Sequence, residues 1–246
     1  MYIKRSLEPW VIKRAKEYAV LAILGPRQSG KTTLAQQVFK NHIYINLEKP
    51  QIREFAISDP EGFLNSNKNK YGIILDEVQN APQLLSYIQV LVDENRIPGY
   101  FILTGSQNFL IRDSISQSLA GRVAILTLLP FSIEELTKAN QLEENLETQI
   151  YKGFYPPIYA HKLEIDNWYS NYIETYVEKD VRKIENIDKI SEFQNFIKLC
   201  AGRVGQLLNL SSLSIDAGVS VATIKSWLSI LEASYIIFIL RPYHNN

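Results

Sequence analysis

The sequence predicts an α/β fold in which a core with a parallel sheet and a phosphate-binding loop is followed by an α-helical linker and a C-terminal winged-helix module. Three observations lead to this prediction. Apolar runs of strand length alternate with helical patterns over roughly the first 130 residues. The first of these runs leads into a glycine-rich loop and a helix. Near the end of the chain, two short helical patterns are followed by an apolar run.

The predicted strands are five apolar runs, and they cover residues 20–24, 43–47, 72–75, 100–103 and 123–126. A short helical lead-in is expected over residues 1–19, and residues 84–92 carry apolar side chains at helical spacing. The polar segment 59–70 is expected to form a loop. Strands that alternate with helices predict parallel βαβ units with both faces of the sheet covered.

The character of the sequence changes after Pro130, because strand runs stop and the residues become helical and charged. The segment 153–157, with sequence GFYPP, predicts a break and a domain hinge. An aromatic stripe at helical spacing follows, and we interpret it as core packing: Trp168, Tyr169, Tyr172, Ile173, Tyr176 and Val177. The expected domains are a core over residues 1–135, a helical linker or lid over 136–197 and a winged-helix-like module over 198–246.

The loop after the first strand has the pattern G-x-x-x-x-G-K-[ST], with sequence GPRQSGKT from Gly25 to Thr32. Its glycines let the backbone curl so that N–H groups point at phosphate oxygens, and the next helix adds the positive end of its dipole. Lys31 would reach the β- and γ-phosphates, and the hydroxyl of Thr32 would bind Mg²⁺. The predicted nucleotide-binding residues are Gly25, Pro26, Arg27, Gln28, Ser29, Gly30, Lys31, Thr32 and Thr33. A glycine-rich turn with a surface lysine is the alternative, but the strand–loop–helix context favours a P-loop NTPase core.

An acidic pair, Asp76 and Glu77, closes the third predicted strand. The carboxyl ends of parallel strands form the ligand-binding edge of such a sheet. We therefore expect Asp76 to hold Mg²⁺ opposite Thr32, and Glu77 to polarise a water for in-line attack on the γ-phosphate. The alternative is a pair of surface acids that begins a turn.

Two further candidates follow the fourth predicted strand. Thr104 or Ser106, at its end, would sense the γ-phosphate or orient the water, and a simple glycine turn at Gly105 is an equal alternative. Arg122 would neutralise charge in the transition state, either in cis or from a neighbouring chain. Without its context, Arg122 is more typical of a surface ion pair.

The composition of the sequence narrows the expected cellular compartment and the expected binding partners. The formal net charge is zero, so no global field attracts nucleic acid or an anionic membrane. Cys200 is the only cysteine, which excludes an intrachain disulfide and a cysteine-based metal cluster and favours a reducing compartment. The first ten residues lack the apolar core of a signal peptide, and no apolar run is long enough to span a membrane. A cytoplasmic location is expected.

Several motifs in combination are similar to one family. They are GPRQSGKTTL at 25–34, DEVQ at 76–79, LTGS at 103–106, LAGR at 119–122, LPFS at 129–132 and YVEKD at 176–180. The chain resembles the AAA-14 family of bacterial and archaeal AAA-like P-loop ATPases, which carry a C-terminal DUF4143 region. The resemblance implies ATP as the nucleotide, Asp76 on the metal, Glu77 as the catalytic carboxylate and Arg122 as a phosphate-sensing or finger residue.

The length of the chain departs from that resemblance. Family members look about half as long again and often end in a region that resembles a restriction endonuclease. This chain ends at Asn246, so we expect a C-terminally shortened member, and we find no nuclease-type constellation of carboxylates and a lysine. A nuclease function is therefore not supported by these residues.

The C-terminal residues 206–240 predict a winged helix. A first helix is expected over 213–219, a second over 221–232 and a wing strand over 235–240. The functional interpretation is a recognition helix in the DNA major groove, but the second helix carries only Lys225 as a basic residue. Four other basic residues would help only if folding gathered them: Lys179, Arg182, Lys183 and Arg203. DNA binding stays open, and a structural or protein-docking role is favoured.

The residues therefore predict an ATP hydrolase whose nucleotide state moves the C-terminal module. The alternative is a non-hydrolysing, nucleotide-gated regulator that binds DNA or a protein. A small-molecule kinase is a third interpretation, but it would need an acceptor pocket and lid arginines after the core. The expected cofactors are ATP and Mg²⁺, the expected partners are DNA or a protein at residues 206–240, and a homo-oligomer is required if Arg122 acts in trans.

Overall fold

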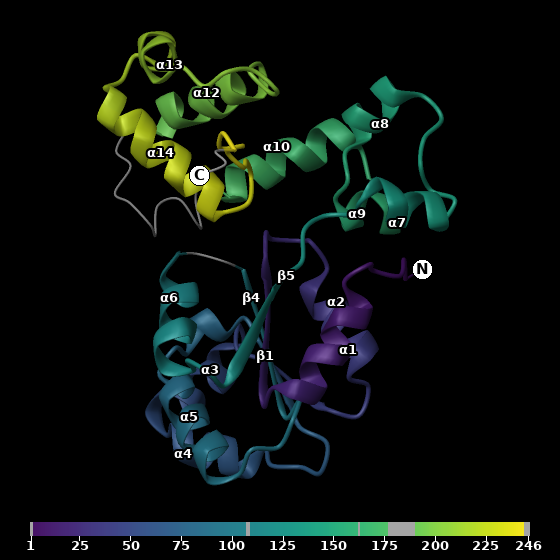
Figure 1. Ribbon diagram of the computed structural model, residues 1–246, viewed down its shortest axis with the longest axis vertical. Coiled ribbons are helices and arrows are strands. Elements are labelled where there is room, and N and C mark those ends of the chain that lie inside the picture. The colour runs from purple at the N-terminus through teal and green to yellow at the C-terminus, as the bar shows by residue number, and fades with distance from the viewer. Residues whose placement is uncertain (1, 107–108, 162, 177–189, 244–246) are drawn as a thin grey trace. The chain divides into compact units, whose positions relative to one another are not determined.

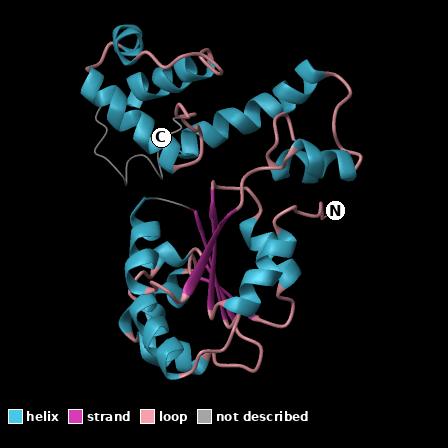
Figure 2. Cartoon of the chain, viewed as in Figure 1, coloured by secondary structure: helices cyan, strands magenta, loops and turns pink. Residues whose placement is uncertain are grey.

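The computed structural model describes residues 2–106, 109–161, 163–176 and 190–243. The chain divides into two compact units, Met1–Leu163 and Glu164–Asn246. The division falls within the segment that we expected to be a helical linker, and the three-part division of the sequence stays a prediction. Strands are confined to the first unit among the described residues, as the magenta arrows of Figure 2 show.

The first unit is built on a parallel sheet of five strands. They are β1 (Val20–Gly25), β2 (Ile43–Asn46), β3 (Ile73–Asp76), β4 (Phe101–Ser106) and β5 (Val123–Thr127). Their order across the sheet is β2-β3-β4-β1-β5, and every pair is parallel. The predicted α/β fold with a parallel sheet is confirmed. Because β4 lies between β1 and β3, the ends of these three strands meet at one edge.

Helices cover both faces of this sheet (Figure 1). One face carries α1 (Glu8–Glu17) and α2 (Lys31–Val38), and the other carries α3 (Pro50–Ser58), α4 (Pro60–Ser66), α5 (Leu84–Glu94) and α6 (Phe109–Ser118). Strand β1 is buried along its whole length, and its alternate side chains enter two different core clusters. This is why its sequence is a continuous apolar run and does not alternate with polar residues.

One local prediction for this unit is wrong. The segment 59–70 was expected to be a loop, but most of it forms α4. Asp59 caps that helix by accepting a hydrogen bond from the Gly62 N–H at 2.9 Å, and Pro60 occupies the first turn. An Asp-Pro pair is a helix-start signal as well as a turn signal, and here burial of Phe63 and Leu64 stabilises the helix.

Three short helices complete the first unit. They are α7 (Ile133–Lys138), α8 (Leu146–Lys152) and α9 (Pro156–Ala160). Ser132 and Glu135 form a capping box at the start of α7. Gly153 ends α8 with a positive φ of 69°, so the predicted break at 153–157 is confirmed.

The regular elements described in the second unit are all helices. It contains α10 (Ile165–Tyr176), α12 (Ile190–Ala201), α13 (Leu210–Ala217) and α14 (Val221–Ala233). Phe193, Phe196 and Trp227 pack their rings together at centroid distances between 5.2 and 6.0 Å. Tyr172 and Tyr176 of the aromatic stripe are buried as expected, whereas Val177 lies outside the described residues.

The two predicted C-terminal helices are confirmed, and Gly218 ends α13 in the left-handed conformation. The predicted wing strand at 235–240 is wrong, because these residues form no strand. Within the described part of this unit no other strand exists to pair with them, and a strand needs a partner for its backbone groups. Instead, the Ile236 N–H donates to the Leu231 carbonyl at the end of α14, and Phe238 and Leu240 are exposed.

Candidate functional site

The glycine-rich loop joins the end of β1 to the start of α2, as predicted. Gly25 has φ 151°, and a Cβ there would lie 2.2 Å from the Leu128 carbonyl oxygen, so only glycine fits. Gly30 has φ 91° and is the N-cap residue of α2, which places the loop at the positive end of that helix. The backbone of this loop therefore has the curled form that binds phosphate.

Lys31 lies buried in this loop, with 5% of its surface exposed. Its Nζ donates to the carbonyl oxygens of Gly25 at 3.1 Å and Pro26 at 2.7 Å. The ammonium group is therefore held by the backbone of the same loop. A buried ammonium group beside a curled loop is suited to attract an anion.

Asp76, at the end of β3, is buried and accepts hydrogen bonds from three hydroxyl groups. Thr32 Oγ1 lies 2.9 Å from Oδ1 and 3.0 Å from Oδ2. Tyr44 donates to Oδ2 at 2.7 Å, and Thr104 Oγ1 donates to Oδ1. The sequence predicted that Thr32 and Asp76 would face one another, and the structure brings them together with Thr104.

Tyr44 is a member of this cluster that the sequence analysis missed. Burial is the main cause that raises the pKa of Tyr44, and the hydrogen bond to Asp76 and the charge of Asp76 raise it further. The phenol therefore stays protonated and donates. Tyr44 is the second residue of β2, two residues before the register partner of Asp76, and its place on the strand that pairs with β3 is the signal that would have identified it. The side chain of Ser106, the other candidate for the Thr104 role, lies outside the described part of the chain.

Glu77 follows Asp76 in a conformation that is rare for its residue type. It has φ 58° and ψ 49°, the left-handed region that a non-glycine residue adopts at a cost of about 1–3 kcal/mol. Gln79, which the sequence analysis also missed, donates from Nε2 to Glu77 Oε2. Strain of this kind often occurs at functional sites, so the turn that aims Glu77 is consistent with a role there.

Arg122 is a candidate that the structure does not bring to the loop. It precedes β5, and its carbonyl oxygen accepts from the Val20 N–H at the amino end of β1. The loop lies six residues further along β1, about 20 Å away at strand spacing. Arg122 instead binds both carboxylate oxygens of Asp93, at 2.5 and 2.7 Å. A role in cis is therefore wrong, because a residue before a parallel strand lies at the opposite edge from the loop.

The residues at the loop fit a magnesium nucleotide. Thr32 and Asp76 offer hard oxygen donors, and Mg²⁺ is usually held by one or two carboxylates together with substrate phosphates. Within the described ranges, no group of three His, Cys, Asp or Glu side chains forms a self-sufficient metal cage. Ser29 Oγ is buried and has no hydrogen-bond partner among the residues described. A phosphate oxygen would satisfy this hydroxyl.

A cavity of about 300 Å³ lies beside the loop. Its lining is mostly apolar and aromatic: Tyr2, Ile3, Arg5, Gly30, Thr33, Phe131, Gln141, Pro156, Tyr159 and Ala160. It reaches the loop at Gly30 and the first turn of α2 at Thr33. Apolar walls with a few polar groups are typical of small-ligand sites.

The parallel sheet, the loop and the Thr32–Asp76 contact together define a P-loop nucleotide-binding core of the AAA class. Residues 17–137 match the AAA_14 family model, described as an AAA domain, and this part of the chain belongs to that family. Residues 143–246 match a different model, a domain of unknown function designated DUF8612, and not the DUF4143 region that the resemblance named.

Two curated relatives cover most or all of this chain. An uncharacterized protein of Mycobacterium tuberculosis is 27% identical over 253 residues, which cover 100% of this chain and 55% of the relative. An uncharacterized protein of Haemophilus influenzae is 22% identical, over 91% of this chain and 62% of its own length. The chain thus spans little more than half the length of the curated relatives it matches.

One solved structure supports the fold. The Walker-type ATPase PABY2304 of Pyrococcus abyssi aligns with a TM-score of 0.53 and 14% sequence identity, over 95% of this chain and 90% of that one. At this identity the likeness concerns the fold alone. Separately, none of the helices in the described residues is both long and apolar enough to cross a bilayer.

Proposed function

We propose that this chain binds ATP with Mg²⁺, hydrolyses it, and couples its nucleotide state to the C-terminal unit. The observation that carries the proposal is the hydrogen-bonded cluster of half-buried Thr32 with buried Asp76 and Thr104, next to buried Lys31. Buried charges and hydroxyls at the carboxyl edge of a parallel sheet are costly without a ligand that uses them. AAA family membership of residues 17–137 supports a nucleotide as that ligand.

Each residue of the site has a distinct role in this proposal. Backbone N–H groups of residues 25–33 bind the phosphates, and Lys31 neutralises charge on the β- and γ-phosphates. Thr32 and Asp76 hold Mg²⁺, which supplies further positive charge when bound. Thr104 links β4 to the metal ligand Asp76 and so senses the γ-phosphate.

Hydrolysis is assigned to Glu77. Its carboxylate accepts a proton from the attacking water as the water oxygen bonds to the γ-phosphorus and the bond to the β–γ bridging oxygen breaks. The products are ADP and inorganic phosphate. Because Gln79 hydrogen-bonds Glu77 in the structure, we infer that this carboxylate must exchange that partner for water before it can act.

The cavity beside Gly30 and Thr33 is the proposed place for the base. Its aromatic and apolar walls favour a flat ring over a polar group. The family resemblance favours adenine, and the sequence holds no Asn-Lys-x-Asp motif of the kind that recognises guanine.

A second candidate function is a nucleotide-gated regulator that does not hydrolyse its nucleotide. The Glu77–Gln79 hydrogen bond is the observation that favours it, because the proposed base is already occupied. In both candidates the partner binds at α13 and α14, and we favour a protein over DNA there. Arg203 is paired with Asp216, which leaves Lys225 as the exposed basic residue of α14, while Ile215 is exposed on α13. The basic residues Lys179, Arg182 and Lys183 lie outside the described ranges.

Glu77→Gln tests the proposal, because it keeps the size of the side chain and removes the base. We expect turnover of MgATP to fall by about 10²- to 10⁴-fold, while the Kd for MgATP stays within about twofold. Glu61→Gln, on the exposed surface of α4, is the matched control and should change neither quantity. Phosphate release and equilibrium binding measure the two effects.

Three other outcomes would support a different mechanism or function. Turnover at the native rate in Glu77→Gln would remove Glu77 from the mechanism. Tight MgATP binding without turnover in the native chain would favour the regulator. Transfer of phosphate to an added metabolite would indicate a kinase.

A further inference from the structure

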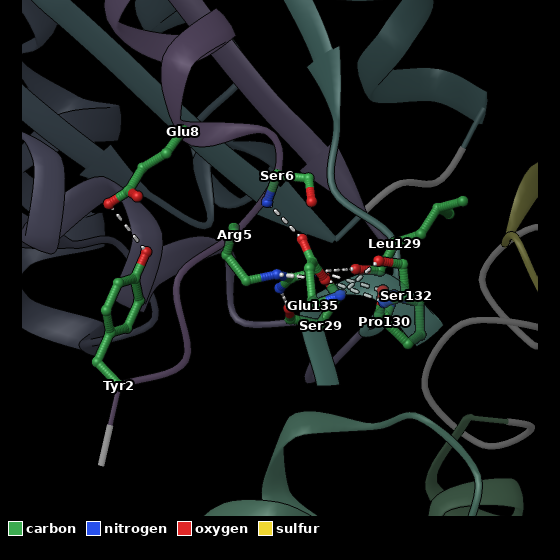
Figure 3. A network of polar contacts seen from close by, with 9 residues as sticks. All are labelled: Tyr2, Arg5, Ser6, Glu8, Ser29, Leu129, Pro130, Ser132 and Glu135. Atoms are coloured by element: carbon green, nitrogen blue, oxygen red, sulfur yellow. Dashed lines mark hydrogen bonds and ion pairs between the residues drawn. The ribbon is translucent and has the colours of Figure 1, made fainter. Parts of the chain in front are cut away.

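Arg5, near the start of the chain, is buried against the phosphate loop with 4% of its surface exposed (Figure 3). Its Nη1 donates to the carbonyl oxygen of Ser29, inside the loop, at 2.8 Å. Its Nη2 donates to the carbonyl oxygens of Leu129 at 2.6 Å and Pro130 at 3.2 Å. One guanidinium group therefore joins three segments that are far apart in sequence.

Glu135 is the counter-ion, and it is buried too. Its Oε2 lies 3.1 Å from Arg5 Nε, and its Oε1 accepts from the Ser6 N–H at 2.6 Å (Figure 3). Oε2 also accepts from the Ser132 N–H at 3.0 Å, which completes the capping box of α7. A buried ion pair adds little net stability, and removal of one partner is strongly destabilising. The position of the Arg5–Glu135 pair beside the loop points to a role other than stability.

The contact with Ser29 constrains the next amide. In a planar trans peptide, the C=O of one residue and the N–H of the next point in opposite directions. Arg5 holds the Ser29 carbonyl, so the Gly30 N–H is aimed away from Arg5. Gly30 has no side chain to fix this peptide, and a glycine backbone can adopt many conformations besides the observed φ of 91°. A cation on the carbonyl also polarises the peptide and strengthens its N–H as a donor.

We propose that Arg5, held by Glu135, is a positioning residue of the phosphate loop. It fixes the Ser29–Gly30 peptide so that the Gly30 N–H is ready to donate to a phosphate oxygen. Through Leu129 and Pro130, the same group ties the loop to the segment that leads from β5 to α7. The inference rests on the proposed function, because it assigns a role within the same nucleotide site.

The double substitution Arg5→Met with Glu135→Gln tests this role without leaving a buried charge unpaired. Gln at position 135 keeps one acceptor oxygen for the Ser132 N–H, so the capping box of α7 is retained, whereas the Ser6 N–H loses its acceptor. Two probes are titrated: MgATP, and inorganic tripolyphosphate with Mg²⁺, which lacks a base. We expect affinity for both to fall by about five- to tenfold, one hydrogen bond's worth. The Tm without ligand should also fall, because the carbonyls of Ser29, Leu129 and Pro130 lose their donor, so binding is measured well below the Tm of the variant.

Two further variants complete the experiment. Arg5→Lys keeps the charge for Glu135 but loses the fork that reaches Ser29 and Leu129 together, so intermediate affinity for both probes is expected. If the double variant does not fold, the affinity of Arg5→Lys for the two probes tests the positioning role of Arg5. Arg14→Lys, at an exposed pair with Glu17, is the control and should bind both probes as the native chain does.

The outcomes separate the inference from the proposed function. A loss confined to MgATP, with tripolyphosphate unaffected, would mean that Arg5 serves only the cavity, and it would overturn the inference. Native affinity for both probes would overturn it as well. If the native chain binds neither probe, the proposed function itself fails.

Discussion

The two edges of the five-stranded sheet differ in where their charges lie. At the carboxyl edge, Lys31, Asp76 and Thr104 are buried. Lys31 donates to the carbonyl oxygens of its own loop, and Thr104 donates to Asp76. At the amino edge, Arg122 and Asp93 form an ion pair with side chains 29% and 49% exposed. Both edges are formed by the ends of the same apolar strands, yet, where the chain is described, only the carboxyl edge has buried charged side chains.

The difference in burial is the reason that we propose the carboxyl edge as the functional one. Among the described residues, eight polar or charged side chains are buried, and six belong to the carboxyl-edge site or its supports: Arg5, Ser29, Lys31, Asp76, Thr104 and Glu135. Burial of a charge costs free energy unless pairing offsets it, and an exposed pair has neither the cost nor much benefit. Substitutions at the two edges should therefore have very different effects on nucleotide binding.

Lys31→Met should produce the largest effect. The substitution keeps an unbranched side chain in the loop but removes the ammonium that Gly25 and Pro26 hold. Loss of a buried charged partner costs about 2–5 kcal/mol, so we expect MgATP affinity to fall by roughly 30- to 5000-fold. Lys40→Met, an exposed lysine just after α2, is the control for loss of a positive charge. Equal affinity in Lys31→Met and native protein, measured by calorimetry, would contradict the assignment of the loop.

Asp76→Asn should have the next largest effect, and specifically on the metal. The amide keeps the shape of the group among the hydroxyls of Thr32, Tyr44 and Thr104, which can rotate to suit it, but it removes the negative charge. We expect the gain in ATP affinity on addition of Mg²⁺ to shrink by about tenfold, while metal-free ATP binds as well as or better than to the native protein. Titration with and without Mg²⁺ measures this difference. A full Mg²⁺ dependence in Asp76→Asn would show that the metal is held elsewhere.

Local patterns predicted the carboxyl edge well. The loop motif lies within ten residues, and the parallel sheet requires that the ends of β1, β3 and β4 meet, so Thr32 and Asp76 had to lie close together. The same rule places Arg122 at the other edge, because it precedes its strand. The sequence analysis did not apply this rule to Arg122, and its interpretation of Arg122 in cis was wrong. The alternative that it named, a surface ion pair, is what the structure has.

Long-range support could not be predicted in the same way. Arg5 and Glu135 are 130 residues apart, and nothing in the sequence near either one indicates the other. Tyr44 joins the site only through the register of β2 against β3. In the C-terminal unit, capping residues such as Asn209 and Ser220 mark the starts of the helices. The prediction of a wing strand was wrong because an apolar run alone does not supply a partner strand.

Asp93→Asn should have the smallest effect, and it tests the amino edge directly. The hydrogen bonds from Arg122 hold the pKa of Asp93 below its ordinary value of 3.8. Because the pKa is lowered in the folded state, any stabilisation by this pair is present above pH 3.8 and is lost as the pH falls through the lowered pKa. The pair is exposed, so we expect the Tm at pH 7 to change little and the difference to vanish in high salt.

The same variant gives a sharp answer on nucleotide turnover. Asp93→Asn releases Arg122 from its partner at an edge about 20 Å from the phosphate loop, so MgATP affinity and turnover should equal those of the native chain at every protein concentration. Turnover that rises with protein concentration in Asp93→Asn, and more steeply than in the native chain, would mean that the released guanidinium reaches the site of a neighbouring chain. The amino edge would then contribute to catalysis in trans, and the contrast between the two edges would hold only within one chain.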